Sequence, residues 1–388
     1  MLEGGADLRI IQMDNGEMVV GEISLSKQQT SIVQYDGNIA VSASAGTGKT
    51  RTMVAKIIYD LERNKTHKVI AAITFTIKAT QEIRDRLVVD TSQNFIGTNN
   101  IFAIEEVIKP FMKDVYGEEY DIDFDTDYTN KDHYFDTFDQ GLDLMRNNGT
   151  IYSYCTRKNC KVHNKNCSAN NRNFVFELAL DITKKSKACK LFLISKYFCI
   201  YIDEYQDCDS EMHDFFMFLS KNLEIRTFVV GDDKQSIYRW RGARPEQFVG
   251  VTTNPSFQHF VLTENHRSSL GIQNYSNLLF SNTSGLYKQT ENIGDIVVIK
   301  RDVEDWASIV VSLLDGTSSA AILRNYKDTS YFGKSNARDD AEILSKCGIE
   351  FVYIPEAPIE QITTSTAWLY MAVARYIMFD EFSVYDFI

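Results

Sequence analysis

The sequence predicts an α/β protein in which a parallel sheet carries a phosphate-binding loop. Two observations favour this fold. Apolar, β-rich segments alternate along the chain with segments of helical periodicity. Polar and charged residues follow directly after those apolar segments, and ligands bind at the carboxyl ends of the strands in such sheets.

The first 24 residues are expected to be an N-terminal extension. Within it, residues 8–23 have the pattern of a β-hairpin, because apolar residues flank Asp14-Asn15-Gly16, a strong turn signal.

A phosphate-binding loop is predicted at 43–50, where the chain reads Ala-Ser-Ala-Gly-Thr-Gly-Lys-Thr. A buried strand over 38–42 precedes it, and a helix over 51–61 follows. Gly46 and Gly48 let the backbone approach an anion and direct N–H groups toward it. Lys49 is placed to bind phosphate oxygens, and the Thr50 hydroxyl to bind Mg²⁺. ATP and Mg²⁺ are therefore the predicted ligands.

Further buried strands are predicted at 69–75, 198–202 and 226–231. Asp203 and Glu204 follow the second of these, where Asp203 would bind Mg²⁺ and Glu204 would polarise the attacking water. Gln235 follows the third, and its amide would sense the γ-phosphate. Arg267 would neutralise charge that develops on this phosphate. The predicted catalytic residues are Lys49, Asp203, Glu204, Gln235 and Arg267.

A surface for single-stranded nucleic acid is predicted beside the same strand ends. Phe75, Tyr238 and Trp240 lie there, with arginines on both sides of Trp240. Bases stack on such rings while Arg and Lys hold the phosphates. The alternative is that the rings belong to the core.

Residues 98–189 lack the strand–helix rhythm and are expected to form an inserted subdomain. It contains Cys155, Cys160, His163 and Cys167, spaced C-x4-C-x2-H-x3-C. Three thiolates and an imidazole are a suitable tetrahedral set for a structural Zn²⁺. A loop with reduced, unliganded cysteines is the alternative reading.

Composition and charge narrow the kinds of ligand and the cellular compartment that are expected for the protein. The chain has 388 residues and a formal net charge of −12, which argues against indiscriminate polyanion binding but not against a local basic groove. No apolar run reaches membrane-spanning length and no signal-peptide pattern opens the sequence. We therefore expect a cytoplasmic protein with no membrane partner and no disulfides.

Taken together, these strings resemble the motor of superfamily 1 helicases of the UvrD/Rep type. Gln29 matches an adenine-reading glutamine, and His266 stands where such motors often place a tyrosine on adenine. The resemblance implies nucleotide contacts by Gln29, Ala45, Gly46, Thr47, Gly48, Lys49, Thr50, Arg51 and His266. It implies DNA contacts by Phe75, Thr76, Lys78, Thr98, Tyr238, Trp240 and Arg241.

The resemblance also implies a domain plan. Residues 25–97 and 190–255 would form a RecA-like P-loop NTPase domain, and 98–189 a mainly helical subdomain. Residues 256–388 would form a second, incomplete RecA-like domain, with strands at 296–299 and 320–323. No Thr-x-His-x-x-Lys-Gly-x-Glu or Thr-Arg-Ala string is present. We therefore expect the chain alone to hydrolyse ATP slowly and to unwind no duplex processively.

A closer resemblance is to the GajB family, the helicase-like subunits of the Gabija antiviral system. It rests on strings such as Phe174-Val-Phe-Glu-Leu-Ala-Leu-Asp-Ile182 and Ile272-Gln-Asn-Tyr-Ser-Asn277. It implies a DNA-dependent ATPase or helicase that responds to single-stranded DNA or DNA ends. It also implies a GajA-like, OLD-family nuclease as partner in a hetero-oligomer. The alternatives are an autonomous repair helicase and a non-catalytic nucleotide-binding scaffold.

Overall fold

A computed structural model of the chain describes residues 11–14, 17–20, 23–87, 92–129, 133–158, 171–278, 285, 288, 306–313 and 343–347. The chain divides into two compact units, Met1–Ser268 and Ser269–Ile388. The first unit carries the sheet and the candidate site.

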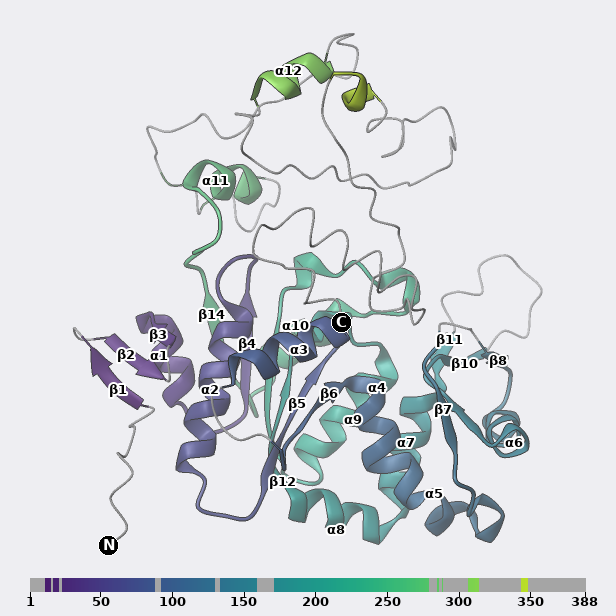
Figure 1. Cartoon of the computed structure of the whole chain (residues 1–388). Coiled ribbons are helices and arrows are strands. Elements are labelled where there is room, and N and C mark those ends of the chain that lie inside the picture. The colour runs from purple at the N-terminus through teal and green to yellow at the C-terminus, as the bar shows by residue number, and fades with distance from the viewer. Residues whose placement is uncertain are drawn as a thin grey trace, which may run out of the picture. The chain divides into compact units, whose positions relative to one another are not determined.

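The centre of the first unit is a six-stranded parallel sheet with the order β14-β4-β13-β12-β5-β6 (Figure 1). Its strands are β4 (Ile39–Ala43), β5 (Val69–Thr74), β6 (Phe95–Thr98), β12 (Tyr197–Ile202), β13 (Arg226–Gly231) and β14 (Gln258–Leu262). The four strands predicted up to residue 231 are thereby confirmed. They are runs of apolar residues because helices cover both faces of the sheet.

Each face of the sheet packs against its own set of helices. Alternate residues of a strand point to opposite faces, so Cys199 and Tyr201 join one hydrophobic cluster while Ile200 and Ile202 join the other. The first cluster includes side chains of α1 (Lys27–Gln34), α2 (Lys49–Arg63) and α3 (Ile77–Arg86). The second includes side chains of α4 (Asn99–Ala103), α7 (Phe174–Lys185), α9 (Ser210–Lys221) and α10 (Pro245–Thr252).

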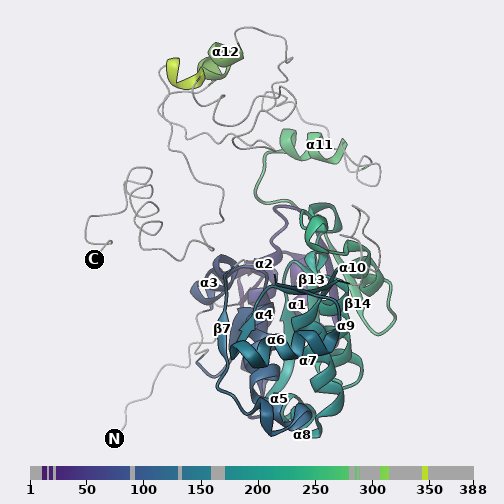
Figure 2. The same cartoon turned by 90° about the vertical axis from the view of Figure 1, so that its right-hand side faces the viewer.

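The inserted segment between β6 and β12 combines helices with short strands, and Figure 2 shows its helices α5, α6 and α7 in front of the sheet. Its helical elements also include η1 (Ile104–Ile108), α5 (Lys109–Tyr116), η2 (Glu118–Tyr120), α6 (Phe138–Asn148) and α8 (Lys187–Lys196). The strands are β7 (Asp125–Asp127), β8 (His133–Phe135), β9 (Thr150–Tyr152), β10 (Cys155–Lys158) and β11 (Asn171–Asn173). They pair as β11-β10-β8 and β7-β9.

The predicted N-terminal hairpin is confirmed. β1 (Ile11–Asp14) and β2 (Glu17–Val20) pair antiparallel, with Asp14 opposite Glu17. A third strand, β3 (Ile23–Leu25), continues this small sheet. In the second unit the structure describes α11 (Leu270–Leu278) and α12 (Trp306–Leu313). The strands expected at 296–299 and 320–323 lie outside the described residues.

Two strands differ from the expectation. β6 forms the sheet edge beside β5, although 95–98 was not expected to be a strand. β14 pairs with β4 at the other edge, and the first unit extends to Ser268. Residues 256–268 thus belong with the first unit and do not open the second domain, because the parallel pairing joins segments far apart in sequence. Within the described residues, no helix is both long and apolar enough to cross a membrane.

Candidate nucleotide-binding and nucleic-acid-binding site

The predicted phosphate-binding loop connects β4 to the first turn of α2. Gly46 has φ 76° and Gly48 has φ 86°, a left-handed conformation that glycine adopts without strain. A β-carbon at Gly46 would lie 2.6 Å from Asn265 Oδ1, and one at Gly48 would lie 2.8 Å from Gln29 Nε2. Both glycines therefore allow the left-handed backbone conformation and the close approach of neighbouring side chains.

Gln29 supports the loop from the side of α1. Its Oε1 accepts a hydrogen bond from Ser26 N at 3.0 Å in a capping box, and its Nε2 donates to Thr47 O at 3.5 Å. The side chain is buried. Arg51, one of the predicted nucleotide contacts, donates from Nη2 to Ser24 O at 2.7 Å and thus lies toward β3.

The segment after β14 holds the same loop from another side. Asn265 Nδ2 donates to Ala45 O at 2.8 Å, and His266 N donates to Gly46 O at 2.8 Å. Asn265 Oδ1 also accepts hydrogen bonds from the backbone N of Arg267 and Ser268. The C=O and N–H of a peptide plane point in opposite directions, so bonds to the two carbonyls fix how the loop presents its N–H groups.

Asn265 therefore places Arg267 beside Gly46. A β-carbon added at Gly46 would lie 2.9 Å from Arg267 Cβ. The sequence had identified Arg267 and His266 but not Asn265, although all three lie in one short polar string. A side chain that bonds to backbone 220 residues away leaves no local sequence signal.

The acidic pair lies at the end of β12. Asp203 is 3% exposed, and its carboxylate accepts a hydrogen bond from Glu204 N at 2.9 Å. Burial, with a further contribution from the Glu204 charge, raises the pKa of Asp203 to about 7. Lys49 Nζ lies 3.6 Å from Glu204 Oε2, which is longer than a close ion pair. Glu204 itself has φ 48°, a strained value for a non-glycine residue.

Polar side chains connect β12 to the loop after β13. Gln206 donates to Glu204 Oε2 at 2.8 Å and accepts from Asp232 N at 2.9 Å. Gln235 Nε2 donates to Asp232 Oδ2 at 2.6 Å. Lys234 Nζ lies 3.3 Å from Ser44 Oγ of the phosphate-binding loop. Gln206 and Lys234 complete the network, and sequence reasoning did not single them out.

A cleft of about 290 Å³ brings together residues of the predicted catalytic and nucleic-acid sets. Thr50, Asp203, Glu204 and Gln235 line it together with Phe75, Thr76 and Tyr238. Three neighbouring parallel strands, β5, β12 and β13, end at this cleft, which explains how residues distant in sequence meet there.

The remaining predicted nucleic-acid residues lie close to these strand ends. Thr76 and Thr98 are the N-cap residues of α3 and α4, and Lys78 is exposed on the first turn of α3. The Arg241 guanidinium lies 5.3 Å from the ring centroid of Tyr238. The side chain of Trp240 lies outside the described part of the structure.

The predicted zinc set gains no support. Cys160, His163 and Cys167 lie outside the described residues. Cys155, on β10, is buried in the second hydrophobic cluster, the one that includes α7 and α9, and burial raises the pKa of its thiol to about 12. Across the described ranges, no group of three or more His, Cys, Asp or Glu side chains is placed to hold a metal ion.

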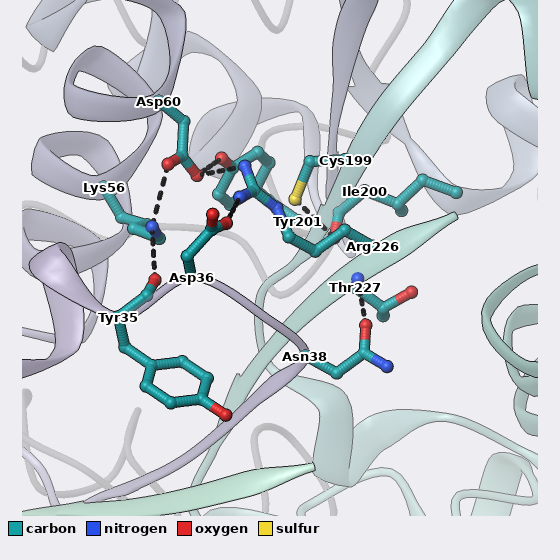
Figure 3. Close-up of polar contacts among 10 residues, drawn as sticks. All are labelled: Tyr35, Asp36, Asn38, Lys56, Asp60, Cys199, Ile200, Tyr201, Arg226 and Thr227. Carbon is teal, nitrogen blue, oxygen red and sulfur yellow. Dashed lines mark hydrogen bonds and ion pairs between the residues drawn. The ribbon is translucent and has the colours of Figure 1, made fainter. Parts of the chain in front are cut away.

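A second polar cluster lies near the other end of α2 (Figure 3). Asp60 accepts contacts from Lys56 Nζ and Arg226 Nη2, each at 2.8 Å, and a hydrogen bond from Tyr201 Oη. Lys56 Nζ also donates to Tyr35 O at 2.8 Å. Lys56 and Asp60 are nearly fully buried, so the cluster ties α1, α2, β12 and β13 together inside the protein.

The chain is similar to proteins of known families. It matches the UvrD/REP helicase N-terminal domain family over residues 25–173 and 153–255. It is 40% identical over 365 residues to the Gabija protein GajB of Bacillus cereus (strain VD045), covering 93% of this chain and 69% of that protein. It is 25% identical over 297 residues to the ATP-dependent DNA helicase Rep of Escherichia coli (strain K12), covering 68% of this chain and 44% of Rep. For Rep of Buchnera aphidicola subsp. Acyrthosiphon pisum (strain APS) the identity is 26% over 375 residues, with 84% and 56% covered. The chain thus spans about half the length of these Rep helicases.

Proposed function

Because this chain belongs to the UvrD/Rep helicase family, we propose that it is a DNA-dependent ATPase that serves as the helicase-like subunit of a Gabija-type defence complex. It binds Mg-ATP in the cleft at the carboxyl ends of β5, β12 and β13. It binds single-stranded DNA, or DNA ends, beside the same cleft.

One observation carries this proposal. The same cleft is lined by Thr50 and Asp203, by Glu204 and Gln235, and by the aromatic side chains of Phe75 and Tyr238. Phosphate chemistry and base stacking therefore have their candidate residues within one small volume. A change in the contacts of the nucleotide residues would therefore also change the position of the aromatic residues.

The residues present fit a magnesium nucleotide. Gly46 and Gly48 have φ values of 76° and 86°, a conformation in which the backbone N–H groups of such a loop can point toward an anion. The pKa of buried Asp203 is raised to about 7, and a nearby cation would favour its charged form. Thr50 and Asp203 would hold the metal ion, whose charge would stabilise the transferred phosphoryl group.

Lys49 and Glu204 have linked roles. Lys49 Nζ lies 3.6 Å from the Glu204 carboxylate, and phosphate oxygens would compete for that ammonium group. Once Lys49 is bound to phosphate, Glu204 can accept a proton from water. Gln206 Nε2 still donates a hydrogen bond to Glu204 Oε2 at 2.8 Å. Gln235, Arg267 and His266 would contact the nucleotide from the loops that follow β13 and β14.

The second part of the proposal concerns the protein partner of this chain. The similarity to GajB supports a subunit that works with a GajA-like, OLD-family nuclease in a hetero-oligomer. Co-expression of the two chains followed by size-exclusion chromatography tests this directly. Co-elution is expected. Separate elution at micromolar concentration would favour an autonomous repair helicase.

Turnover is tested by measuring phosphate release with and without single-stranded DNA. We expect stimulation by DNA, and Glu204→Gln should lower the stimulated rate by about 10²- to 10⁴-fold. Binding of a non-hydrolysable ATP analogue should be unchanged. Glu82→Gln is a matched control, because Glu82 lines the same cleft but pairs with Arg86 at 2.7 Å. A Glu204→Gln variant as active as the wild type would refute the assignment.

A further inference from the structure

Arg241 connects the inserted segment to Tyr238, one of the candidate DNA-contact residues. The Arg241 guanidinium lies 5.3 Å from the ring centroid of Tyr238 and 5.8 Å from that of Tyr154. Arg241 Nη1 also donates to Tyr154 Oη at 3.4 Å. Tyr238 lines the nucleotide cleft, whereas Tyr154 lies between β9 and β10 of the insertion. Aromatic and cationic side chains thus form a continuous series from the cleft to the inserted segment.

The series extends onto the small sheet β11-β10-β8. Lys158 Nζ lies 4.2 Å from the ring centroid of Tyr134, and Tyr134 is 46% exposed. Tyr134 pairs with Thr156 across β8 and β10, in the same register that pairs buried Cys155 with His133. Alternate strand residues share a face. Tyr134, Thr156 and Lys158 therefore occupy the outer face of this sheet, and Tyr154 precedes them by the same two-residue period.

A second set of contacts places that face beside residues 239–242. Asn173, which pairs with Thr156, donates from Nδ2 to Asp209 Oδ2 at 2.8 Å. A β-carbon at Gly242 would lie 3.8 Å from Asp209 Cβ. The Asp209 carboxylate also accepts a hydrogen bond from Met212 N at 2.8 Å. Asn173 and Asp209 thus connect the sheet that contains β10 to the loop after β13.

We propose that Tyr238, Arg241, Tyr154, Tyr134 and Lys158 form a continuous binding strip that guides single-stranded DNA from the nucleotide cleft onto the inserted subdomain. This rests on the proposed function, and it extends the DNA site to residues outside the predicted set. Successive bases stack on the tyrosine rings, and Arg241 and Lys158 exchange their cation–π contacts for phosphates. With a net charge of −12, the protein depends on such local cations for affinity.

The test is fluorescence anisotropy of labelled oligo-dT on the full chain without nucleotide. We use an oligomer of about 20 nucleotides, which reaches the subdomain, and one of about six, which does not. Tyr134→Ala and Tyr154→Ala should each weaken binding of the long oligomer about tenfold and leave the short one unchanged. Tyr134→Phe and Tyr154→Phe should bind like the wild type, because stacking needs only the ring. Lys158→Ala should lower the slope of log affinity against log salt by about 0.7.

Tyr35→Ala is the matched control, an exposed tyrosine whose backbone lies beside Lys56 and whose ring contacts Phe260 at 5.7 Å. It should bind both oligomers normally. If both alanine variants in the insertion bind the long oligomer like the wild type, the strip is only a structural link and the proposal is overturned, whatever their melting temperatures. If the wild type binds neither oligomer, the proposed DNA-binding function itself fails.

Discussion

The two ends of helix α2 hold charged groups in opposite ways. At its first turn, Lys49 lies 3.6 Å from Glu204, and buried Asp203 accepts a hydrogen bond from Glu204 N but lies in no ion pair within the described part of the chain. Toward its last turn, Asp60 contacts Lys56 and Arg226 at 2.8 Å and accepts a hydrogen bond from Tyr201 (Figure 3). The acidic groups at the first turn thus lack a close cationic partner within the described residues, whereas the Asp60 carboxylate has two cations and a hydroxyl group as partners.

The difference separates the candidate binding site from a structural anchor. Buried charges are tolerated when partners and hydrogen bonds compensate them, as at Asp60. Where compensation is incomplete, as at Asp203, the energetic cost can be relieved by a ligand of opposite charge. The anchor fixes α2 against β12 and β13, and residues of the cleft follow directly after both strands.

The largest expected effect comes from breaking the anchor. Asp60→Ala leaves the Lys56 ammonium and the Arg226 guanidinium without their shared carboxylate inside the protein. We expect the free energy of unfolding to fall by about 3 kcal/mol, measured by urea denaturation. Asp36→Asn is the control within the same network, since Asp36 also pairs with Arg226 but its side chain is 87% exposed. It should cost less than about 1 kcal/mol.

Asp203→Asn provides the contrast at the other end of the helix. It removes a buried charge that lacks a close cation, so it should not destabilise the protein at neutral pH. A loss of stability comparable to that of Asp60→Ala would mean that the two ends of α2 do not differ as described.

The next effect concerns the contacts that hold the phosphate-binding loop. Asn265→Ala removes the donor to Ala45 O and the acceptor for two backbone N–H groups. We expect ADP to bind about tenfold more weakly by calorimetry, because the loop N–H groups lose their fixed orientation. Arg267→Ala should affect only triphosphate analogues. Asn254→Ala, which removes a local turn contact to Ser256 N, should have no effect. Normal ADP binding by Asn265→Ala would limit Asn265 to a role in folding.

The smallest effect concerns His213, a half-buried histidine on α9. His213 Nδ1 contacts Tyr205 Oη at 3.0 Å, and burial, with a lesser effect of Lys221, lowers the pKa of His213 to about 4. Between about pH 6.5 and 4 the unfolded chain therefore takes up a proton that the folded chain does not, so stability falls as the pH falls. His213→Gln should reduce this loss by about 1 kcal/mol at pH 5.

Thermal unfolding from pH 7 to 4.5 measures this difference, with the exposed His67→Gln as control. Three carboxyl groups with raised pKa values act in the opposite direction, namely Asp203, Asp207 and Asp209. They are present in the wild type and in both variants. Parallel pH profiles for His213→Gln and the wild type would show that His213 titrates normally.

The sequence predicted the parts of the fold that depend on local signals. A glycine-rich loop between an apolar strand and an amphipathic helix identified Gly46 to Thr50, and an acidic pair after an apolar run identified Asp203 and Glu204. β6 and β14 were harder, since short edge strands carry little periodicity and their partners lie far away in sequence. Asn265 and Arg226 were missed for the same reason. A polar side chain that folds onto distant backbone or a distant carboxylate looks like a surface residue in the sequence.

The central claim is that the loop at 43–50 and the acidic end of β12 form one nucleotide site. It is tested most directly by isothermal titration of the wild-type chain and Lys49→Ala with Mg-ADP and a non-hydrolysable Mg-ATP analogue. The wild type should bind one nucleotide, and Lys49→Ala should bind about tenfold or more weakly, because a charge-assisted contact to phosphate is lost. Lys65→Ala, an exposed lysine beyond the end of α2, should bind normally. Equal affinity of the wild type and Lys49→Ala for both nucleotides would contradict the account.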